Sequence, residues 1–319
     1  MTGKTAIITG ATGMIGIALI GRLLDEGYEV IAITRPESNR AGNIPANSCV
    51  HVIALGMSDY SNLASEVRSA GINKADMFFH LAWDGTYGDS RNDMDIQTAN
   101  IKAALEALRA ASELGCAVFL GAGSQAEYGR VDDGVKISGV LPCRPENGYG
   151  IAKLCAGQMT RVEAKRLGIK HIWTRILSVY GPYDGMQTMV MSGISKMASG
   201  QKASYTKGEQ IWDYIYCKDA AKAIYLAALN GSEGAIYPIG SGNPRMLRDY
   251  ITAIRDAVDP SLEIGFGEVP YYPGQVMYLC ADISDLESDT GFVPEYTFER
   301  GIRETVEWYN NSRENVGGR

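Results

Sequence analysis

The stretch TGATGMIG, residues 9–16, directly follows an apolar run and leads straight into a helical pattern. This order predicts a strand, a turn and a helix, with Gly10, Gly13 and Gly16 in the turn. Glycine suits the bend, the close approach of a ligand to the backbone, and the packing of helix on strand. The first amides of the helix would then be free to bind a pyrophosphate. The alternative is a plain βα turn, because 37 glycines produce such spacings by chance.

Seven apolar runs alternate with helical patterns through the first 240 residues. Near-continuous apolar strands separated by helices predict a parallel sheet that is covered on both faces, which is a doubly wound α/β core. The expected strands are residues 5–9, 29–34, 49–54, 77–81, 117–121, 171–176 and 235–239. The expected helices are residues 13–26, 61–70, 93–114, 149–166 and 219–229.

The alternating pattern is interrupted twice, after Gly181 and after Gly240. We expect a dinucleotide-binding core of residues 1–180 plus about 211–240. Residues of about 181–210 plus 241–319 would form a smaller C-terminal α/β lobe. Open α/β sheets bind ligands at the carboxyl ends of their strands, so a substrate cleft is expected between core and lobe.

Composition excludes several classes of function. A net charge of -7 without a Lys/Arg block argues against binding to nucleic acid or an anionic membrane. No apolar stretch reaches the ~18 residues that a membrane span needs, and no basic leader precedes the first strand, so we expect a cytoplasmic protein. Six scattered cysteines indicate reduced thiols, and three isolated histidines suggest no metal site.

Tyr149 and Lys153 stand four residues apart at the start of an expected helix, so they share one face. An ammonium beside a phenol favours the phenolate, which predicts a lowered pKa for Tyr149 and a role in proton transfer. Tyr214 and Lys218 have the same spacing, but they begin in an alternating segment typical of a short strand. Ser124 ends an expected strand and would face the same cleft as Tyr149, so we favour the first pair as the functional one.

These residues resemble the extended short-chain dehydrogenases/reductases, which include nucleotide-sugar epimerases, 4,6-dehydratases and 4-ketoreductases. The resemblance covers nearly the whole chain. Its motifs are TGATGMIG, HLAW at 80–83, Asn100, GSQAEYG at 123–129, YGIAK at 149–153, YGP at 180–182 and WDYIYCKDA at 212–220.

The resemblance implies a Rossmann sheet, a nicotinamide dinucleotide and a substrate carbon that faces the nicotinamide ring. Tyr149 would exchange a proton with the substrate oxygen, Lys153 would hold the nicotinamide ribose and tune Tyr149, and Ser124 would hydrogen-bond the same oxygen. The matching cofactor positions are Gly10, Thr12, Gly13, Met14, Ile15, Gly16, Arg35, Met57, Leu81, Ala82, Asn100, Tyr149 and Lys153.

One departure from the family pattern reduces the number of candidate reactions. In the 4,6-dehydratases the residue that corresponds to Ser124 is followed by Asp-Glu, whereas this chain has Gln125 and Ala126. A carboxamide and a methyl group cannot carry the proton for loss of water. Glu127 is one position further along, where strand geometry would turn it to the opposite face. Dehydratase chemistry is therefore disfavoured.

Arg35 directly follows the second expected strand, at the place where NAD-preferring members usually carry an acidic residue. A guanidinium matches a 2′-phosphate, so we favour NADP over NAD as the cofactor. The alternative is a solvated residue at a strand end. A preference for NADPH would fit net reduction better than epimerisation, which returns its hydride in each cycle.

The sequence also offers candidate residues for substrate recognition. Residues 267–284 resemble the C-terminal lobe of sugar-nucleotide 4-ketoreductases such as CDP-abequose synthase. Two positions that often hold Asn and Arg in the family are Ser178 and Trp212 here. For several of the candidate residues, the alternative is a purely structural place in a polar surface loop or in the core. The candidate substrate residues are Asp84, Tyr87, Gln125, Ser178, Trp212 and Gln275.

We therefore expect an enzyme that reduces the 4-keto group of a nucleotide-activated deoxysugar, with Tyr149 as the proton donor. An NAD-dependent nucleotide-sugar 4-epimerase is the alternative, and a dinucleotide-binding protein without catalysis is a third hypothesis. The helices expected at 93–114 and 149–166 resemble the pair with which family members form a four-helix dimer interface. A homodimer is expected, unless these apolar faces are covered within one chain.

Overall fold

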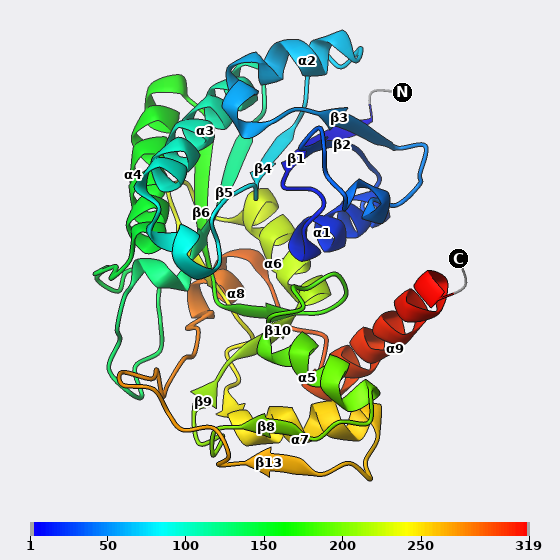
Figure 1. Ribbon diagram of the computed structural model, residues 1–319. Coiled ribbons are helices and arrows are strands. Elements are labelled where there is room, and N and C mark those ends of the chain that lie inside the picture. The colour runs from blue at the N-terminus through cyan, green and yellow to red at the C-terminus, as the bar shows by residue number, and fades with distance from the viewer. Residues whose placement is uncertain (1–2, 318–319) are drawn as a thin grey trace.

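Seven parallel strands form the central sheet, in the order β11-β6-β5-β4-β1-β2-β3 (Figure 1). This computed structural model describes residues 3–317, with side chains described through residue 313. The seven strands are those expected from the sequence, within a few residues at their ends. Their bounds are β1 Lys4–Thr9, β2 Tyr28–Thr34, β3 Val50–Ala54, β4 Met77–His80, β5 Val118–Ser124, β6 Lys170–Ile176 and β11 Ile236–Ile239.

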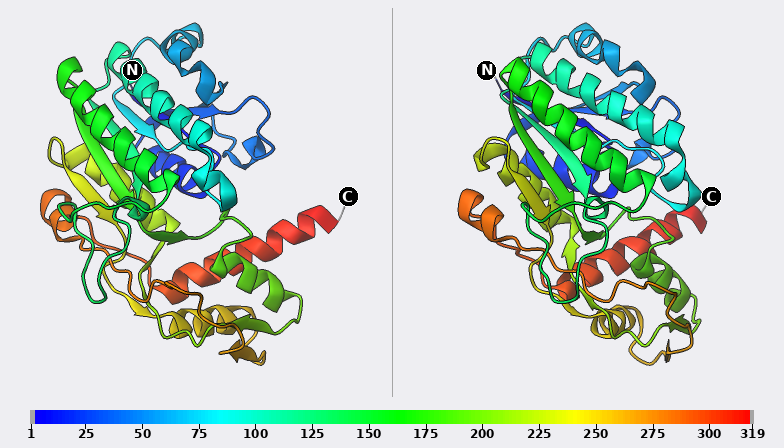
Figure 2. Two further views of the ribbon diagram at one scale, coloured as in Figure 1. Left: turned by 60° about the vertical axis from the view of Figure 1, so that its left-hand side comes forward. Right: turned by 90° about the vertical axis from the view of Figure 1, so that its left-hand side faces the viewer.

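Helices cover both faces of this sheet (Figure 2). Successive side chains of a strand point to opposite faces, so Ala6 and Ile8 pack with α1 and α6, whereas Ile7 packs with α2 and α3. The doubly wound Rossmann-type α/β fold is thereby confirmed. The covering helices are α1 Met14–Asp25, α2 Leu63–Ser69, α3 Met94–Glu113, α4 Gly148–Leu167 and α6 Cys217–Asn230.

The strand order reverses between β1 and β4, and the glycine turn lies at this point. Gly10 has a φ of +72°, and a Cβ there would stand 2.7 Å from the backbone nitrogen of Ala82, just beyond β4. A Cβ on Gly16 would stand 2.4 Å from the carbonyl oxygen of Gly10. The turn, the first helix and the end of β4 therefore pack so closely that no side chain fits between them.

A smaller lobe lies beyond the carboxyl edge of the sheet (Figure 1). Its helices share a hydrophobic cluster that includes Met191, Ile194, Ile254 and Ile302. Strands β7 and β10 pair with each other, as do β8 with β13 and β9 with β12. The bounds are β7 Ser178–Tyr180, α5 Met189–Ala198, β8 Ala203–Tyr205, β9 Ile211–Trp212, β10 Tyr214–Tyr216, β12 Arg245–Met246, α7 Leu247–Val258, β13 Ile264–Phe266 and α9 Phe298–Gly317.

One segment that the sequence places with the lobe packs against the core. Leu279, Ala281 and Phe292 are buried in the same cluster as α1 and α6, and helix α8 (Ser284–Thr290) contacts α6 and β11. The chain thus returns to the core before α9 rejoins the lobe. Four 3-10 helices complete the described secondary structure: η1 Ala41–Asn43, η2 Met57–Asn62, η3 Gly88–Asn92 and η4 Gln125–Glu127.

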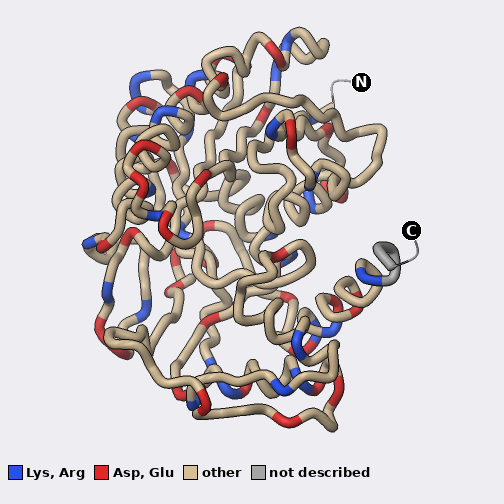
Figure 3. Tube along the Cα trace, viewed as in Figure 1, with Lys and Arg blue, Asp and Glu red and all other residues tan. Residues whose placement is uncertain are grey.

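Positively and negatively charged residues are interspersed along the chain (Figure 3). Among the described residues, no helix combines the length and the apolar character that a membrane crossing requires.

Two glycines of α1 provide a matched test of the turn. The Gly16→Ala substitution should lower the free energy of unfolding by about 1–3 kcal/mol, because the new methyl group meets the backbone of Gly10. A Cβ on Gly21 would have no atom within 4 Å, so Gly21→Ala should raise stability by about 0.5–1 kcal/mol. Urea denaturation of both variants checks this, and equal effects would contradict the close packing of the turn.

Candidate active site

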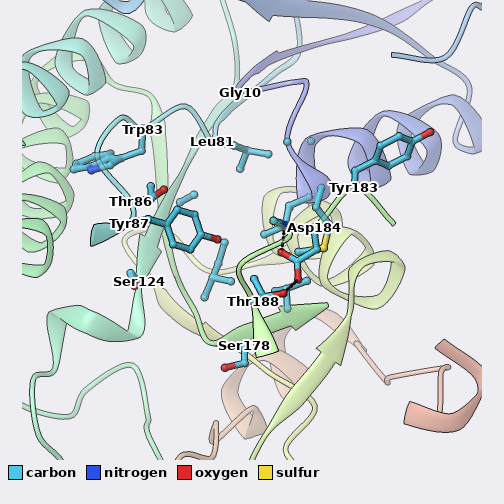
Figure 4. A pocket seen from close by; sticks show the side chains of 18 of the residues that line it. Gly10, Leu81, Trp83, Thr86, Tyr87, Ser124, Ser178, Tyr183, Asp184 and Thr188 are labelled. Carbon is cyan, nitrogen blue, oxygen red and sulfur yellow. Dashed lines mark hydrogen bonds between the residues drawn. The ribbon is translucent and has the colours of Figure 1, made fainter. Parts of the chain in front are cut away.

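A cleft of about 760 Å³ lies at the carboxyl edge of the sheet, between the core and the lobe. The glycine turn, the ends of β4 and β5, the start of α4 and residues 176–190 line it. Figure 4 shows that Tyr87 and Ser124 approach from one side and Tyr183, Asp184 and Thr188 from the other. The cleft is therefore where the sequence analysis expected a substrate site.

The glycine turn forms the wall of the cleft that suits a pyrophosphate. Gly13 caps α1 without a side-chain hydrogen bond, and the first turn of α1 carries no acidic residue. A Cβ on Gly13 would meet only the carbonyl oxygen of Gly10, at 3.5 Å, so the backbone is open towards the cleft. The residues of the expected cofactor set that line this cleft are Gly10, Gly13, Met14, Ile15, Gly16, Leu81, Tyr149 and Lys153. Thr12 and Ala82 do not line it.

A second hollow, of about 1250 Å³, is suited to the adenosine end of a dinucleotide. Three of the residues expected to bind the cofactor, Arg35, Met57 and Asn100, line it together with Glu37 and Asp84. Nη1 of Arg35 lies 3.7 Å from the Asp84 carboxylate; the Arg35 side chain is 67% exposed and that of Asp84 is 48% exposed. The cation expected to meet a 2′-phosphate therefore has an acidic neighbour, and Asp84 borders the adenosine hollow instead of the substrate cleft.

Ser124 and Tyr149 meet at the cleft from two different elements. Ser124 is the last residue of β5, and its Oγ accepts a hydrogen bond from the backbone of Ala126 (3.2 Å). Tyr149 is the second residue of α4, whose N-cap is Asn147. A hydrogen bond to Ser124 lowers the pKa of Tyr149, but burial outweighs it and raises that pKa above its ordinary value.

Lys153 is held against the backbone of Ala122 and the ring of Trp83. Its Nζ donates to the carbonyl oxygen of Ala122 (2.6 Å) and lies 3.8 Å from the ring centre of Trp83, but 5.9 Å from that of Tyr149. Burial lowers the pKa of Lys153 to about 7, because the ammonium is removed from water. The expected fall in the pKa of Tyr149 is therefore wrong for this structure: burial of the phenol dominates.

Two buried amide side chains on α3 hold the loop that carries Asp84 and Tyr87. Gln97 accepts from the Trp83 indole (3.0 Å) and donates to the carbonyl oxygens of Gly85 (2.9 Å) and Ser90 (3.0 Å). Asn100 accepts from the backbone nitrogen of Asp84 (3.0 Å) and donates to its carbonyl oxygen (2.9 Å). The sequence analysis missed Gln97, whose only signal was its position one turn before Asn100 on the same helix face.

Glu127 points away from the cleft, as expected, but for a different reason. Residues 125–127 form the 3-10 helix η4 and do not continue the strand. The Glu127 carboxylate is fully buried, lies 2.7 Å from Nε of Arg175, and accepts from the Trp173 indole (3.0 Å). The carboxylate also accepts a hydrogen bond from the backbone nitrogen of Ser124 (2.9 Å), so both of its oxygens are hydrogen-bonded inside the protein.

The remaining candidate substrate residues divide into two groups. Tyr87 and Ser178 line the cleft, whereas Gln125, Trp212 and Gln275 do not. The Trp212 indole donates a hydrogen bond to the hydroxyl of Ser178 (2.8 Å). Trp212 therefore packs behind the residue that lines the cleft.

The two members of the second Tyr/Lys pair lie in different surroundings: Tyr214 lines the cleft, whereas Lys218 does not. Tyr214 is partly buried and packs edge-on against Tyr180 and Tyr250. Lys218 forms an ion pair with Glu304 (2.8 Å).

The sequence analysis also missed the far wall of the cleft. Asp184 accepts hydrogen bonds from Thr188 (2.9 Å) and from the backbone of Gly185 (2.7 Å), and burial raises its pKa to about 6. Tyr183 has a φ of +69°, which is unusual for a residue other than glycine. Its carbonyl oxygen accepts from Nη2 of Arg40 (2.6 Å), so a core residue reaches across to the lobe at the cleft.

Among residues 3–313, no group of three or more His, Cys, Asp or Glu side chains is arranged to hold a metal ion. The cleft is lined by hydroxyl groups, an amide, the carboxyl group of Asp184 and the cationic side chains of Arg40, Arg91 and Lys153, a set that suits a phosphate-bearing dinucleotide and a polyhydroxylated substrate.

The glycine turn at a strand-order reversal and the hydroxyl groups beside it define a dinucleotide-dependent enzyme of the extended short-chain dehydrogenase/reductase type. Residues 6–240 match the model of the NAD dependent epimerase/dehydratase family. The chain belongs to this family, which the motifs around Gly10, Ser124 and Tyr149 had indicated.

Individual relatives are dehydratases and epimerases of nucleotide sugars. The chain is 25% identical over 341 residues to a dTDP-glucose 4,6-dehydratase from Escherichia coli, covering 97% of this chain and 94% of that protein. Its fold is similar to that of the UDP-N-acetylglucosamine 4-epimerase from Methanobrevibacter ruminantium in complex with UDP-N-acetylmuramic acid (TM-score 0.86, 24% identity, 98% and 100% of the chains covered). It is also similar in fold to the dTDP-glucose 4,6-dehydratase from Bacillus anthracis in complex with NAD (TM-score 0.80, 19% identity, 98% of each chain covered). These relatives support the family, but not the specific likeness to CDP-abequose synthase.

The buried Glu127–Arg175 ion pair generates a prediction about stability. Glu127→Gln should lower the free energy of unfolding by about 3–5 kcal/mol, because the Arg175 guanidinium would remain buried without its counter-charge. Glu146→Gln is the matched control: its ion pair with Arg130 is exposed, and the loss should be less than about 1 kcal/mol. Denaturant unfolding measures both, and a Glu127→Gln variant as stable as the wild type would contradict a structural role.

Proposed function

We propose that the protein transfers a hydride to the 4-keto carbon of a nucleotide-activated sugar, with Tyr149 as the proton donor. The observation that carries the proposal is the convergence of the Ser124 and Tyr149 hydroxyl groups beside the glycine turn. The neighbouring carboxylate, Glu127, accepts from the backbone nitrogen of Ser124 (2.9 Å) but is paired with Arg175 and does not line the cleft. Asp184 lies on the opposite, lobe-side wall. Two hydroxyl donors that face the cleft, with the nearest carboxylate turned into the protein, suit reduction of a carbonyl group.

In this reduction each residue of the site has a distinct role. A bound nicotinamide dinucleotide supplies the hydride. The Tyr149 hydroxyl donates its proton to the carbonyl oxygen of the substrate, and the Ser124 hydroxyl hydrogen-bonds the same oxygen. The raised pKa of Tyr149 keeps the phenol protonated at neutral pH, which is the form that a proton donor requires. Lys153, fixed by the carbonyl oxygen of Ala122, faces the cleft where the nicotinamide ribose would bind.

Loss of water is less well supported, although several relatives are 4,6-dehydratases. The residues that follow Ser124 are a carboxamide and a methyl group, and neither lines the cleft. The carboxyl group that lines the cleft is that of Asp184, and it would have to transfer the proton for elimination. This group accepts hydrogen bonds from Thr188 and Gly185 on the lobe side.

A nucleotide-sugar 4-epimerase is the second candidate, and one observation favours it. The hydrogen bond from Arg40 to the carbonyl oxygen of Tyr183 bridges core and lobe at the cofactor cleft (2.6 Å). Such a bridge would slow exchange of the dinucleotide, which suits an epimerase that recovers its own hydride. Under this alternative the purified protein would retain close to one equivalent of NAD, whereas a reductase would release oxidised cofactor after each turnover.

The choice between NAD and NADP depends on the adenosine hollow. Arg35 favours a 2′-phosphate, but Asp84 partly offsets its charge, and Glu37 adds a second carboxylate. The structurally similar Bacillus anthracis dehydratase is in complex with NAD. NAD is therefore the better supported cofactor, and a preference for NADP remains a prediction.

A homodimer through α3 and α4 also remains a prediction. Ile151, Met159 and Val162 on α4 and Met94 on α3 are between 44% and 66% exposed. Apolar side chains at helical spacing on an open face are typical of a helix that packs against a second copy.

The function is tested by following oxidation of NADPH and of NADH with a panel of 4-keto nucleotide sugars. Tyr149→Phe should lower the turnover number by about 10²–10⁴-fold, because the proton donor is lost while the ring remains. Ser178→Ala, at the same cleft but away from the glycine turn, should retain more activity. Turnover by Tyr149→Phe at the wild-type rate would contradict the proposed donor. Interconversion of 4-epimers without net oxidation of cofactor would select the epimerase.

The role of Arg35 gives a prediction about cofactor choice. Arg35→Ala should raise the KM for NADPH about tenfold or more and leave the KM for NADH nearly unchanged, because a charge-assisted hydrogen bond to the 2′-phosphate is lost. Asp84→Asn is the matched control, with the opposite effect expected. Removal of the acidic neighbour of Arg35 should lower the KM for NADPH. If the KM values for NADPH and NADH change equally in both variants, Arg35 does not distinguish a 2′-phosphate from a 2′-hydroxyl group.

A further inference from the structure

Arg91 differs from every other arginine that is buried or half-buried in the part of the chain that the structure describes. Arg91 is half-buried, lines the cleft and pairs with no carboxylate of these residues. Taking a charge out of water without a counter-charge is costly, so an anion from outside the chain would complete this part of the cleft. The other four arginines all form ion pairs: Arg22 with Glu26, Arg175 with Glu127, Arg245 with Glu299 and Arg255 with Asp256.

The guanidinium of Arg91 has hydrogen-bond donors to spare. Its Nη1 donates to the carbonyl oxygen of Thr86 (3.1 Å), and no residue between 3 and 313 accepts from its Nε or Nη2. An arginine side chain carries five N–H donors in a flat fork. The two oxygens of a carboxylate match two of these donors side by side, which makes this pairing strong and directional.

The loop after β4 holds Arg91 in place from both sides. The carbonyl oxygen of Ser90 accepts a hydrogen bond from Gln97 on α3 (3.0 Å). The side chain of Asn92 accepts one from the backbone nitrogen of Gly148 at the start of α4 (2.9 Å). Both chain neighbours of Arg91 are thus tied to helices of the core. Less conformational freedom is then lost when a ligand binds.

Arg91 lies beside the residue that would act on the substrate oxygen. Its Cζ is 4.4 Å from the centre of the Tyr149 ring. In the proposed reaction that oxygen is bonded to C4 of the sugar. C4 and the anomeric carbon, which carries the diphosphate, lie at opposite corners of a six-membered sugar ring. An anionic group next to C4 therefore belongs to the sugar itself and not to the diphosphate.

The position of this anion identifies its chemistry. Once the diphosphate occupies the anomeric carbon, C6 is the carbon of a hexose that can be a carboxylate, and it is bonded to C5, the neighbour of C4. We propose that Arg91 is a specificity-determining residue that binds the C6 carboxylate of a nucleotide-activated uronic acid. The inference deepens the proposed function and rests on it, because it takes C4 as the carbon that meets Tyr149.

The other charged groups of the cleft are compatible with an anionic sugar. The described residues that line it include three cations, Arg40, Arg91 and Lys153, and one carboxyl group, that of Asp184. Asp184 accepts from Thr188 and Gly185 and forms no ion pair with Arg91. Arg40 donates to the lobe and Lys153 to the end of β5, so each of these cations already has an acceptor of its own.

The test measures binding without hydride transfer. Wild-type protein saturated with NADH is titrated in a calorimeter with UDP-glucuronate and UDP-glucose, and then with the corresponding dTDP pair. The members of each pair differ at C6, where one has a carboxylate and the other a hydroxymethyl group. All of them carry a hydroxyl group at C4, so the reduced cofactor has no carbonyl group to reduce. The uronate should bind about tenfold or more tightly than the neutral sugar.

Three variants locate the source of this preference. In Arg91→Gln the affinity for the uronate should fall about ten- to hundredfold, while that for the neutral sugar should change much less. Arg91→Lys keeps the charge but not the fork, so it should retain part of the preference. Arg40→Gln removes a charge from the same cleft at its lobe side, and it should affect the acidic and the neutral sugar equally.

Several results would overturn the proposal. Equal affinities of the wild type for the two members of each pair would do so, and so would a failure to bind any of them. An equal loss for both sugars in Arg91→Gln would assign Arg91 to the diphosphate, and a loss of NADH affinity alone would assign it to the cofactor. If Arg91→Gln does not fold, an undiminished preference in Arg91→Lys overturns the proposal.

This result is separate from that of the proposed reaction. A protein that binds uronates through Arg91 but reduces no 4-keto sugar would retain the inference about the ligand and lose the proposed function. A reductase that acts on neutral 4-keto sugars and shows no preference for a carboxylate would retain the function and lose the inference.

Discussion

The close backbone contact between the glycine turn and the end of β4 is the constraint on which the site depends. Gly10 approaches Ala82, and Gly16 approaches Gly10, at distances that exclude any side chain. This contact brings the start of α1 to the point where the strand order reverses, with its free amides facing the cleft. The loop that follows β4 begins at the same place, so the position of Trp83, Tyr87 and Arg91 is linked to that of the turn.

Around this turn, buried polar side chains do the positioning. Gln97 and Asn100 hold the loop after β4, and Glu127 joins the end of β5 to β6 through Trp173 and Arg175. Each of these groups is buried and hydrogen-bonded, so removing one partner would leave another unsatisfied in a medium of low polarity. The hydroxyl groups of Ser124 and Tyr149 are thereby presented by a rigid frame, whereas the lobe supplies the opposite wall.

The sheet could be predicted because buried parallel strands leave near-continuous apolar runs in the sequence. The seven strands, the glycine turn and the meeting of Ser124 with Tyr149 all follow from local pattern and from the common edge of a parallel sheet. Three expectations depended instead on side-chain directions over long distances. Gln125, Trp212 and Gln275 lie outside the cleft. Gln125 belongs to a 3-10 helix, and the Trp212 indole donates to Ser178. The pKa of Tyr149 rises for a similar reason, since spacing along a helix does not reveal burial.

The central claim is that hydride is transferred at the C4 carbon of a nucleotide-activated sugar. It is tested most directly by supplying reduced cofactor labelled with deuterium at the transferred position, together with a 4-keto nucleotide sugar, and locating the label in the product by NMR. The account predicts deuterium bonded to C4 of the product, in one stereochemical configuration. Deuterium at any other carbon, or product without deuterium, would contradict it.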